Sequence, residues 1–77
     1  MLPGTPRTFI GSTTFAVRGL TGVASQRFLV ELISAVGGVE SVTIDLARGT
    51  VTVTAFEPVD RADISLAVEP AGFALIA

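Results

Sequence analysis

Hydrophobic and polar residues follow two different periods along the chain, and these periods divide it into six elements. Apolar residues at every second position predict strands over residues 13–18, 39–46, 50–55 and 73–76. Apolar residues spaced three and four apart predict helices over residues 23–36 and from about 61 to 70. On this pattern the first strand points Phe15 and Val17 into a core. The first helix faces that core with an apolar stripe of Leu29, Leu32, Ile33 and Val36.

Polar residues, glycine and proline mark where these elements end. Thr21 is expected to cap the first helix with its hydroxyl group, and Asp60 has the same position before the second helix. Turn residues around Gly49 join the second and third strands into a β-hairpin. Pro70 lacks an amide hydrogen and is expected to end the second helix. The chain therefore has clear local signals at most of its element boundaries.

The order strand, helix, strand, strand, helix, strand predicts an α+β fold, the ferredoxin-like βαββαβ sandwich. Right-handed crossovers place the strands in a four-stranded antiparallel sheet with two helices on one face. We expect a single domain over residues 13–77, preceded by a flexible N-terminal tail over residues 1–12. Because this fold serves many functions, the function has to be argued from particular residues.

The composition excludes several classes of function. The 77 residues include no Cys and no His, so the chain lacks thiolate and imidazole ligands and the usual general base. The basic residues are five dispersed arginines and the net charge is −2, which argues against nucleic-acid binding. Acidic residues interrupt every apolar run before it reaches the length of a membrane span. We expect a non-catalytic domain that needs no cofactor and does not insert into a membrane.

Two stretches resemble a known family. One reads Gly38-Val39-Glu40-Ser41-Val42-Thr43-Ile44-Asp45-Leu46-Ala47-Arg48-Gly49-Thr50-Val51-Thr52-Val53, and the other reads Glu69-Pro70-Ala71-Gly72-Phe73. Both are similar, in register, to patterns of the heavy-metal-associated domains found in copper chaperones and at the N-termini of metal-pumping P-type ATPases. The resemblance covers residues 13–77 and implies the same fold.

The resemblance also locates a vestigial metal site. In the family the first loop reads Gly-Met-x-Cys-x-x-Cys, and its two thiolates bind a soft ion such as Cu(I). Here the Met position is Leu20, and the two Cys positions are Gly22 and Ser25. Glycine offers no ligand, and a serine hydroxyl is a hard ligand that suits Cu(I) poorly. The resemblance therefore implies a loop that binds no metal.

Two further pairs of residues are candidates for a site. Asp60 and Asp63 are close enough in sequence to share a hard cation, although aspartates at a helix start more often cap the helix. Phe28 and Leu66 lie off the apolar stripes of their helices and are expected to be exposed. Single exposed hydrophobic residues are common, but together these two also suit a partner-docking surface on the helical face, with residues 19–25 at its edge.

Three functional hypotheses follow. The preferred one is a degenerate heavy-metal-associated domain of a copper-type transport system. It would be the cytosolic N-terminal module of a P-type ATPase, tethered to the inner membrane through the rest of that protein, and would contact a chaperone or other transporter domains. The second is a free-standing, chaperone-like protein that has lost its cysteines or had them removed. The third is a small-ligand regulatory domain of the same topology, against which the in-register match over residues 38–53 argues. The gene's flanking sequence would discriminate among them.

Overall fold

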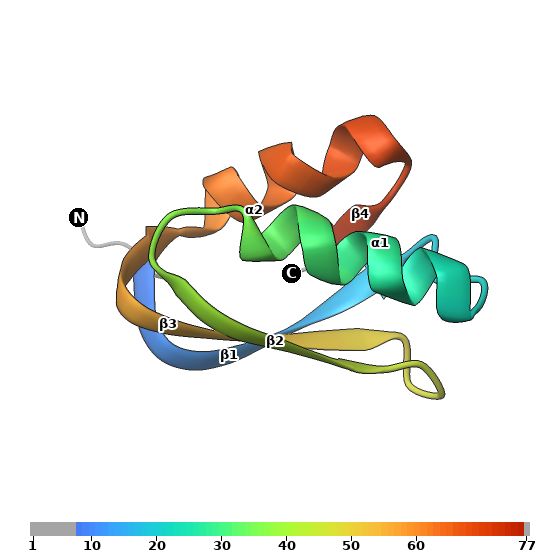
Figure 1. The fold of residues 1–77 in the computed structure, drawn as a ribbon, viewed down its shortest axis with the longest axis horizontal. Coiled ribbons are helices and arrows are strands. Elements are labelled where there is room, and N and C mark those ends of the chain that lie inside the picture. Colours follow the sequence, from blue (N-terminus) through green and yellow to red (C-terminus); the bar gives the residue numbers. More distant parts are fainter. Residues whose placement is uncertain (1–7, 77) are drawn as a thin grey trace.

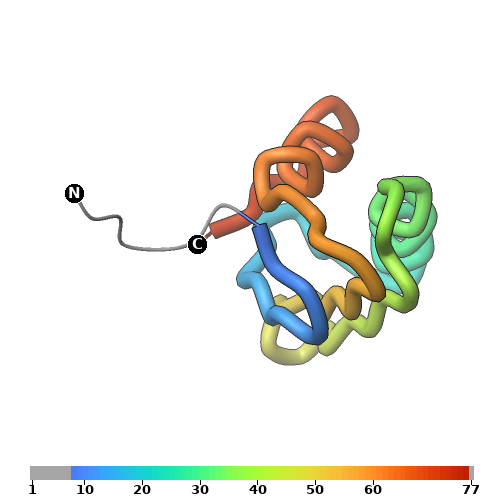
Figure 2. Tube along the Cα trace, turned by 90° about the vertical axis from the view of Figure 1, so that its left-hand side faces the viewer, coloured from blue at the N-terminus to red at the C-terminus, as the bar shows by residue number. Residues whose placement is uncertain are grey.

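The chain forms a two-layer sandwich of helices on a sheet (Figure 1). The computed structural model describes residues 8–76. Its elements are β1 (Thr8–Arg18), α1 (Val23–Ser34), β2 (Val39–Asp45), β3 (Thr50–Asp60), α2 (Arg61–Val68), the 3₁₀ helix η1 (Glu69–Ala71) and β4 (Ala74–Ile76). The strands form one antiparallel sheet in the order β2-β3-β1-β4. Figures 1 and 2 show both helices on the same face, so the predicted ferredoxin-like sandwich is confirmed.

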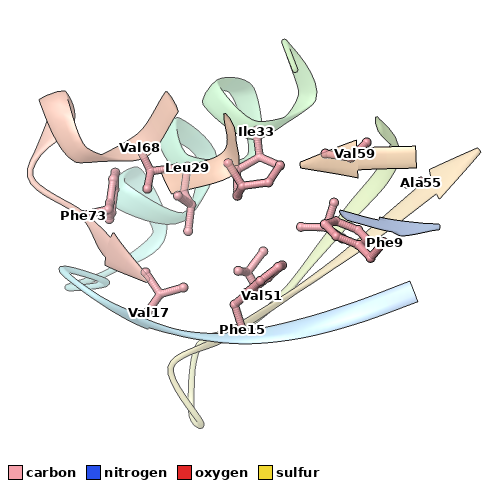
Figure 3. Close-up of a cluster of buried hydrophobic side chains, with 12 residues drawn as sticks. Phe9, Phe15, Val17, Leu29, Ile33, Val51, Ala55, Val59, Val68 and Phe73 are labelled. Carbon is pink, nitrogen blue, oxygen red and sulfur yellow. The ribbon is translucent and has the colours of Figure 1, made fainter. Parts of the chain in front are cut away.

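The core lies between the sheet and the two helices (Figure 3). Leu29 and Ile33 of α1 are fully buried, as the helical spacing predicts. Leu32 and Val36 are only partly buried and pack against the margin of the core. The other buried side chains come from both layers and are Phe9, Phe15, Val17, Val51, Val53, Ala55, Val59, Ile64, Val68 and Phe73. This core is aliphatic around a small number of Phe rings, as the composition requires.

The first strand is longer than the sequence pattern predicts. It begins at Thr8, whereas residues 1–12 were expected to be a flexible tail, so residues 8–12 belong to the domain. The part of that prediction covering residues 1–7 lies outside the described residues. The early half of β1 is ordered by Phe9, which is buried and meets the Phe15 ring edge-on at 5.8 Å between ring centroids. Arg61, at the start of α2, lies 5.5 Å and 5.6 Å from these two ring centroids.

The third strand also extends past its predicted end, from residue 55 to Asp60. The sequence pattern misses this extension because the β1–β3 ladder is irregular there, with three residues of β3 opposite Ile10 alone. This bulge disrupts the alternation that identifies a strand in the sequence. It also leaves Ile10 and Phe56 exposed, at 63% and 62% of their surfaces. The sheet therefore presents two large apolar side chains to solvent at this end.

Helix ends are set by side-chain caps and by proline. The Asp60 side chain accepts a hydrogen bond from the amide of Ala62 at 2.9 Å, so the expected capping of α2 is confirmed. The α-helix ends at Val68, and Pro70 lies within η1, which carries the chain to Gly72 in a left-handed conformation. β2 ends at Asp45, one residue before the predicted end of that strand, so Leu46 falls in the turn and is 39% exposed.

Candidate functional site

The vestigial loop, residues 19–22, connects the end of β1 to the start of α1 and is held against the segment before β4. Gly19 has a φ of +103°, and a β-carbon there would lie 3.0 Å from Cδ1 of Phe73 and 3.1 Å from the carbonyl oxygen of Gly72. Only glycine fits this close approach. Leu20 is partly buried against the core, so the residue at the family's Met position keeps an apolar packing role without offering sulfur.

Ser25 closes this loop with its side chain. Its Oγ accepts hydrogen bonds from the amides of Thr21 at 2.9 Å and Gly22 at 3.0 Å, and it donates one to the carbonyl oxygen of Gly22 at 2.9 Å. A hydroxyl has one hydrogen to donate and two lone pairs, so these contacts use its full capacity. The serine at the second family Cys position therefore acts as a structural element of the helix start.

The helix cap is not the one that the sequence predicts. Gly22 is the N-cap residue of α1, and its carbonyl oxygen accepts the first helical hydrogen bond, from the amide of Gln26 at 3.0 Å. Thr21 donates its amide to Ser25, and the prediction that its hydroxyl caps the helix is wrong. The reciprocal half of a capping box, in which the third helical residue reaches back to the N-cap amide, replaces it. The pattern Gly-x-x-Ser is the sequence signal for this arrangement.

Gly22, at the first family Cys position, leaves open space. Its φ of 169° and ψ of −168° are extended backbone that any residue adopts. No atom lies within 4 Å of the position that a β-carbon would occupy. The loop backbone thus retains room for a side chain at this position although none is present.

The described part of the chain offers no alternative metal site. Within residues 8–76 no group of three or more acidic, His or Cys side chains is placed to hold a metal ion. Asp63 is exposed in the first turn of α2, close to the capping Asp60, and the two carboxylates have no third partner there. The capping interpretation of this pair accounts for both residues.

Three large apolar side chains of the two helices are exposed. Phe28 and Leu66 are 48% and 65% exposed, as predicted from their positions off the apolar stripes. Val23, which directly follows the loop, is 67% exposed and was not singled out by sequence reasoning. Phe28 rests against Phe73, with 6.3 Å between ring centroids, so its exposed ring has a supported position. We refer to Val23, Phe28 and Leu66 as the helical apolar surface.

Few charged side chains lie near the vestigial loop in the sequence. Arg18 and Arg27 are exposed on either side of the loop, and the loop itself carries no charged residue. Arg48 of the β2–β3 turn lies 3.6 Å from the carboxylate of Asp45, an exposed pair that contributes little to stability. None of the helices within residues 8–76 is long and apolar enough to cross a membrane.

Comparisons with known proteins agree with this geometry. The family profile described as heavy-metal-associated domain matches residues 14–74. No curated protein matches the sequence significantly. Among solved structures, a copper-binding domain from the P-type ATPase HMA7 is 26% identical, with a TM-score of 0.74 over 86% of this chain and 93% of that one.

Two metallochaperones are also similar in structure. CsoZ is 26% identical, with a TM-score of 0.77 over 90% of this chain and all of its own. CopZ has a TM-score of 0.79 over 86% of this chain and 100% of its own, at 19% identity, which shows a shared fold. Chaperones and an ATPase domain thus match the chain to a similar degree.

Proposed function

Because the chain belongs to the heavy-metal-associated domain family, we propose that it is a degenerate member that serves a metal-transport system through protein contact and not through metal ligation. One observation carries this proposal. The two positions that hold cysteines in the family are Gly22, which has no side chain, and Ser25, whose hydroxyl is fully used in closing the loop. Soft ions such as Cu(I) need thiolate or thioether ligands, and this loop supplies neither.

The setting that we propose is the cytosolic N-terminal module of a copper-type P-type ATPase, tethered to the inner membrane by the rest of that protein. The similarity to the HMA7 domain supports it. A free-standing, chaperone-like protein is the second candidate, supported by an equal identity to CsoZ. In both settings the same surface has to recognise a protein partner, so the mode of action does not depend on which is correct.

The contact surface that we propose is the helical apolar surface, with the loop at its edge. Phe28 is supported by Phe73 and therefore loses little freedom when a partner covers it. Val23 and Leu66 each expose about two thirds of their surface and add apolar area to the same helical layer. The partner would be a two-cysteine chaperone of the same organism or a soluble domain of the pump.

The test is a titration of the ¹⁵N-labelled chain with the purified two-cysteine chaperone and, separately, with the soluble domains of the pump. We expect shift changes confined to residues 19–28 and to the surroundings of Leu66. Leu66→Ser should weaken this association, whereas Phe56→Ser, which removes a similarly exposed apolar side chain from the sheet, should leave it unchanged. Shifts that map to the sheet face, or no shifts with any of these proteins, would refute the proposed contact.

Metal binding is tested separately by competition with a Cu(I)-chelating dye. The chain should leave all Cu(I) with the chelator because it contains no Cys and no His. Stoichiometric retention of Cu(I) against the chelator would show that the loop is a functional site, and the proposed mode of action would then be wrong.

A further inference from the structure

Two large apolar side chains project from the outer face of the sheet, at the end opposite the vestigial loop. Gly11 pairs with Ala55, so the β1–β3 register places Ile10 across from Phe56 at the ladder irregularity. Phe9 and Ala55 are buried against the helices, and side chains alternate along a strand. Ile10 and Phe56, the residues that follow them, therefore point to the face that no helix covers.

The rest of this face has a different character. In the next two rows, Ser12 meets Thr54 hydroxyl to hydroxyl at 2.9 Å, and Thr14 meets Thr52 at the same distance. These short side chains form hydrogen bonds with one another and project little from the sheet. The apolar pair of Ile10 and Phe56 is therefore a local feature with a polar margin on one side.

Acidic residues flank the apolar pair. Glu57 directly follows Phe56 along β3 and is exposed. Glu40 is exposed at the irregularity of the β2–β3 ladder, beside the row of Thr54. Neither carboxylate forms an ion pair or a side-chain hydrogen bond with another residue of the described part of the chain. This end of the sheet thus combines exposed apolar area with negative charge that is available to a partner.

The arginines do not offset this charge. Three of them lie toward the loop end of the molecule, namely Arg18, Arg27 and Arg48. Along β1 the distance from Arg18 to Ile10 is about 26 Å at the usual rise per residue, whereas the screening length at physiological ionic strength is about 8 Å. Arg61 lies at the acidic end, but over the rings of Phe9 and Phe15 on the side that the helices cover.

We propose that Ile10, Phe56, Glu40 and Glu57, which we call the acidic sheet surface, bind a basic segment of a partner protein that carries apolar residues between its arginines or lysines. The apolar residues would cover Ile10 and Phe56, and the basic side chains would pair with the two carboxylates. Arginine and lysine suit both tasks, because their stems pack on apolar surface while their charged ends reach a carboxylate. Charge complementarity disfavours nucleic acid and anionic membranes, since both present negative phosphates.

This contact is compatible with the proposed function. The acidic sheet surface lies on the outer face of the sheet, whereas the helical apolar surface belongs to the opposite layer (Figure 1). A protein bound to one layer leaves the other open. If the proposed function holds, the domain can therefore hold two proteins at once, one on each layer.

The test is a titration of the ¹⁵N-labelled full chain with a synthetic heptapeptide in which arginine alternates with leucine. Saturable shift changes should be confined to residues 9–12, 40–41 and 54–58. A peptide of equal length with glutamate in place of arginine should cause none. Raising the ionic strength to about 1 M, where the screening length falls to about 3 Å, should weaken the affinity several-fold. No saturable shifts with the basic peptide, or equal shifts with the acidic one, would overturn the proposal.

Variants of the acidic sheet surface test its position. Phe56→Ser should weaken binding of the basic peptide at least about tenfold, because it removes the apolar anchor at the centre of the contact. Glu40→Gln with Glu57→Gln should weaken binding about fivefold and reduce its dependence on salt, since each exposed ion pair contributes modestly.

Matched controls separate a defined site from general attraction. Glu31→Gln with Glu69→Gln removes the same charge from exposed positions on α1 and η1, and Leu66→Ser removes an exposed apolar side chain from α2. Both controls should bind the basic peptide as the unchanged chain does. A loss with the control pair equal to that with Glu40→Gln and Glu57→Gln would show general charge attraction and would refute the proposed site.

Discussion

Restoring two thiols should convert the vestigial loop into a Cu(I) site, and this change tests whether the family's loop geometry has been retained. The perturbation is the double substitution Gly22→Cys and Ser25→Cys. At Gly22 the backbone is extended and no atom lies within 4 Å of the new β-carbon, so the strain that a positive φ would impose there is absent. Replacing this glycine should stabilise the chain by about 0.4–1 kcal/mol through the unfolded state.

The second substitution should lower the stability of the fold by a limited amount. Ser25→Cys removes the hydroxyl that accepts two amides, and loss of a helix cap costs about 0.5–2 kcal/mol. The two changes nearly cancel, so the double variant should stay folded. The same two amides would then face a sulfur at a helix N-terminus, where thiol pKa values are lowered. Metal binding at structural sites contributes about 10 kcal/mol or more, which far exceeds the stability changes expected from the two substitutions.

The assay is Cu(I) titration of the folded double variant against a chelating dye, beside both single variants. The chain offers a matched control, because Ser34→Cys with Gly37→Cys creates the same spacing at the other end of α1, where both positions are exposed. There helix carbonyl groups oppose a thiolate, so Cu(I) binding should be much weaker. If the folded loop variant binds no more tightly than this control, the reasoning about the loop is wrong.

Three stability predictions rest on single contacts and are read by chemical denaturation. Ser25→Ala should destabilise the chain by about 1 kcal/mol, whereas Thr21→Ala should have little effect because Ser25 makes the cap; equal losses would contradict this. Gly38→Ala should lower the free energy of unfolding by more than about 1 kcal/mol, because φ at Gly38 is +94° and the new β-carbon would lie 2.8 Å from Cγ2 of Val59. Gly37→Ala is the control, because its β-carbon would meet no atom within 4 Å, and it should change stability little. Asp60→Ala should lose about 1 kcal/mol with the capping bond to Ala62, and an unchanged midpoint would show that the cap contributes nothing.

The fold could be predicted from the sequence because its periods are regular where the elements are regular. Phe15, Val17, Leu29 and Ile33 lie in the core at the positions that strand and helix spacing assign to them. The start of β1 could not be predicted, because the inward positions between Phe9 and Phe15 hold Gly11 and Thr13, which give no apolar signal although burial alternates along the whole strand. The end of β3 could not be predicted, because the ladder irregularity opposite Ile10 interrupts its alternation at residues 56–58.

The candidate site was predictable in its position and not in its hydrogen bonding. The family pattern places Leu20 and Gly22 in the loop and Ser25 in the first turn of α1, and the exposure of Phe28 and Leu66 follows from helix phase. Thr21 and Ser25 both carry hydroxyl groups that suit helix capping, and the sequence does not show which backbone conformation the preceding residues adopt. That conformation decides which of the two side chains reaches the free amides.

The hydroxyl of Ser25 also has a consequence for how the domain behaves in a cell. A thiol-lined loop changes with its surroundings, because thiols gain and lose metal and are oxidised. A serine hydroxyl that bridges three backbone groups does none of these. If the proposed function holds, the shape of this loop does not change with the copper supply or with redox conditions. A protein that contacts this domain would then meet a surface that carries no signal of metal supply.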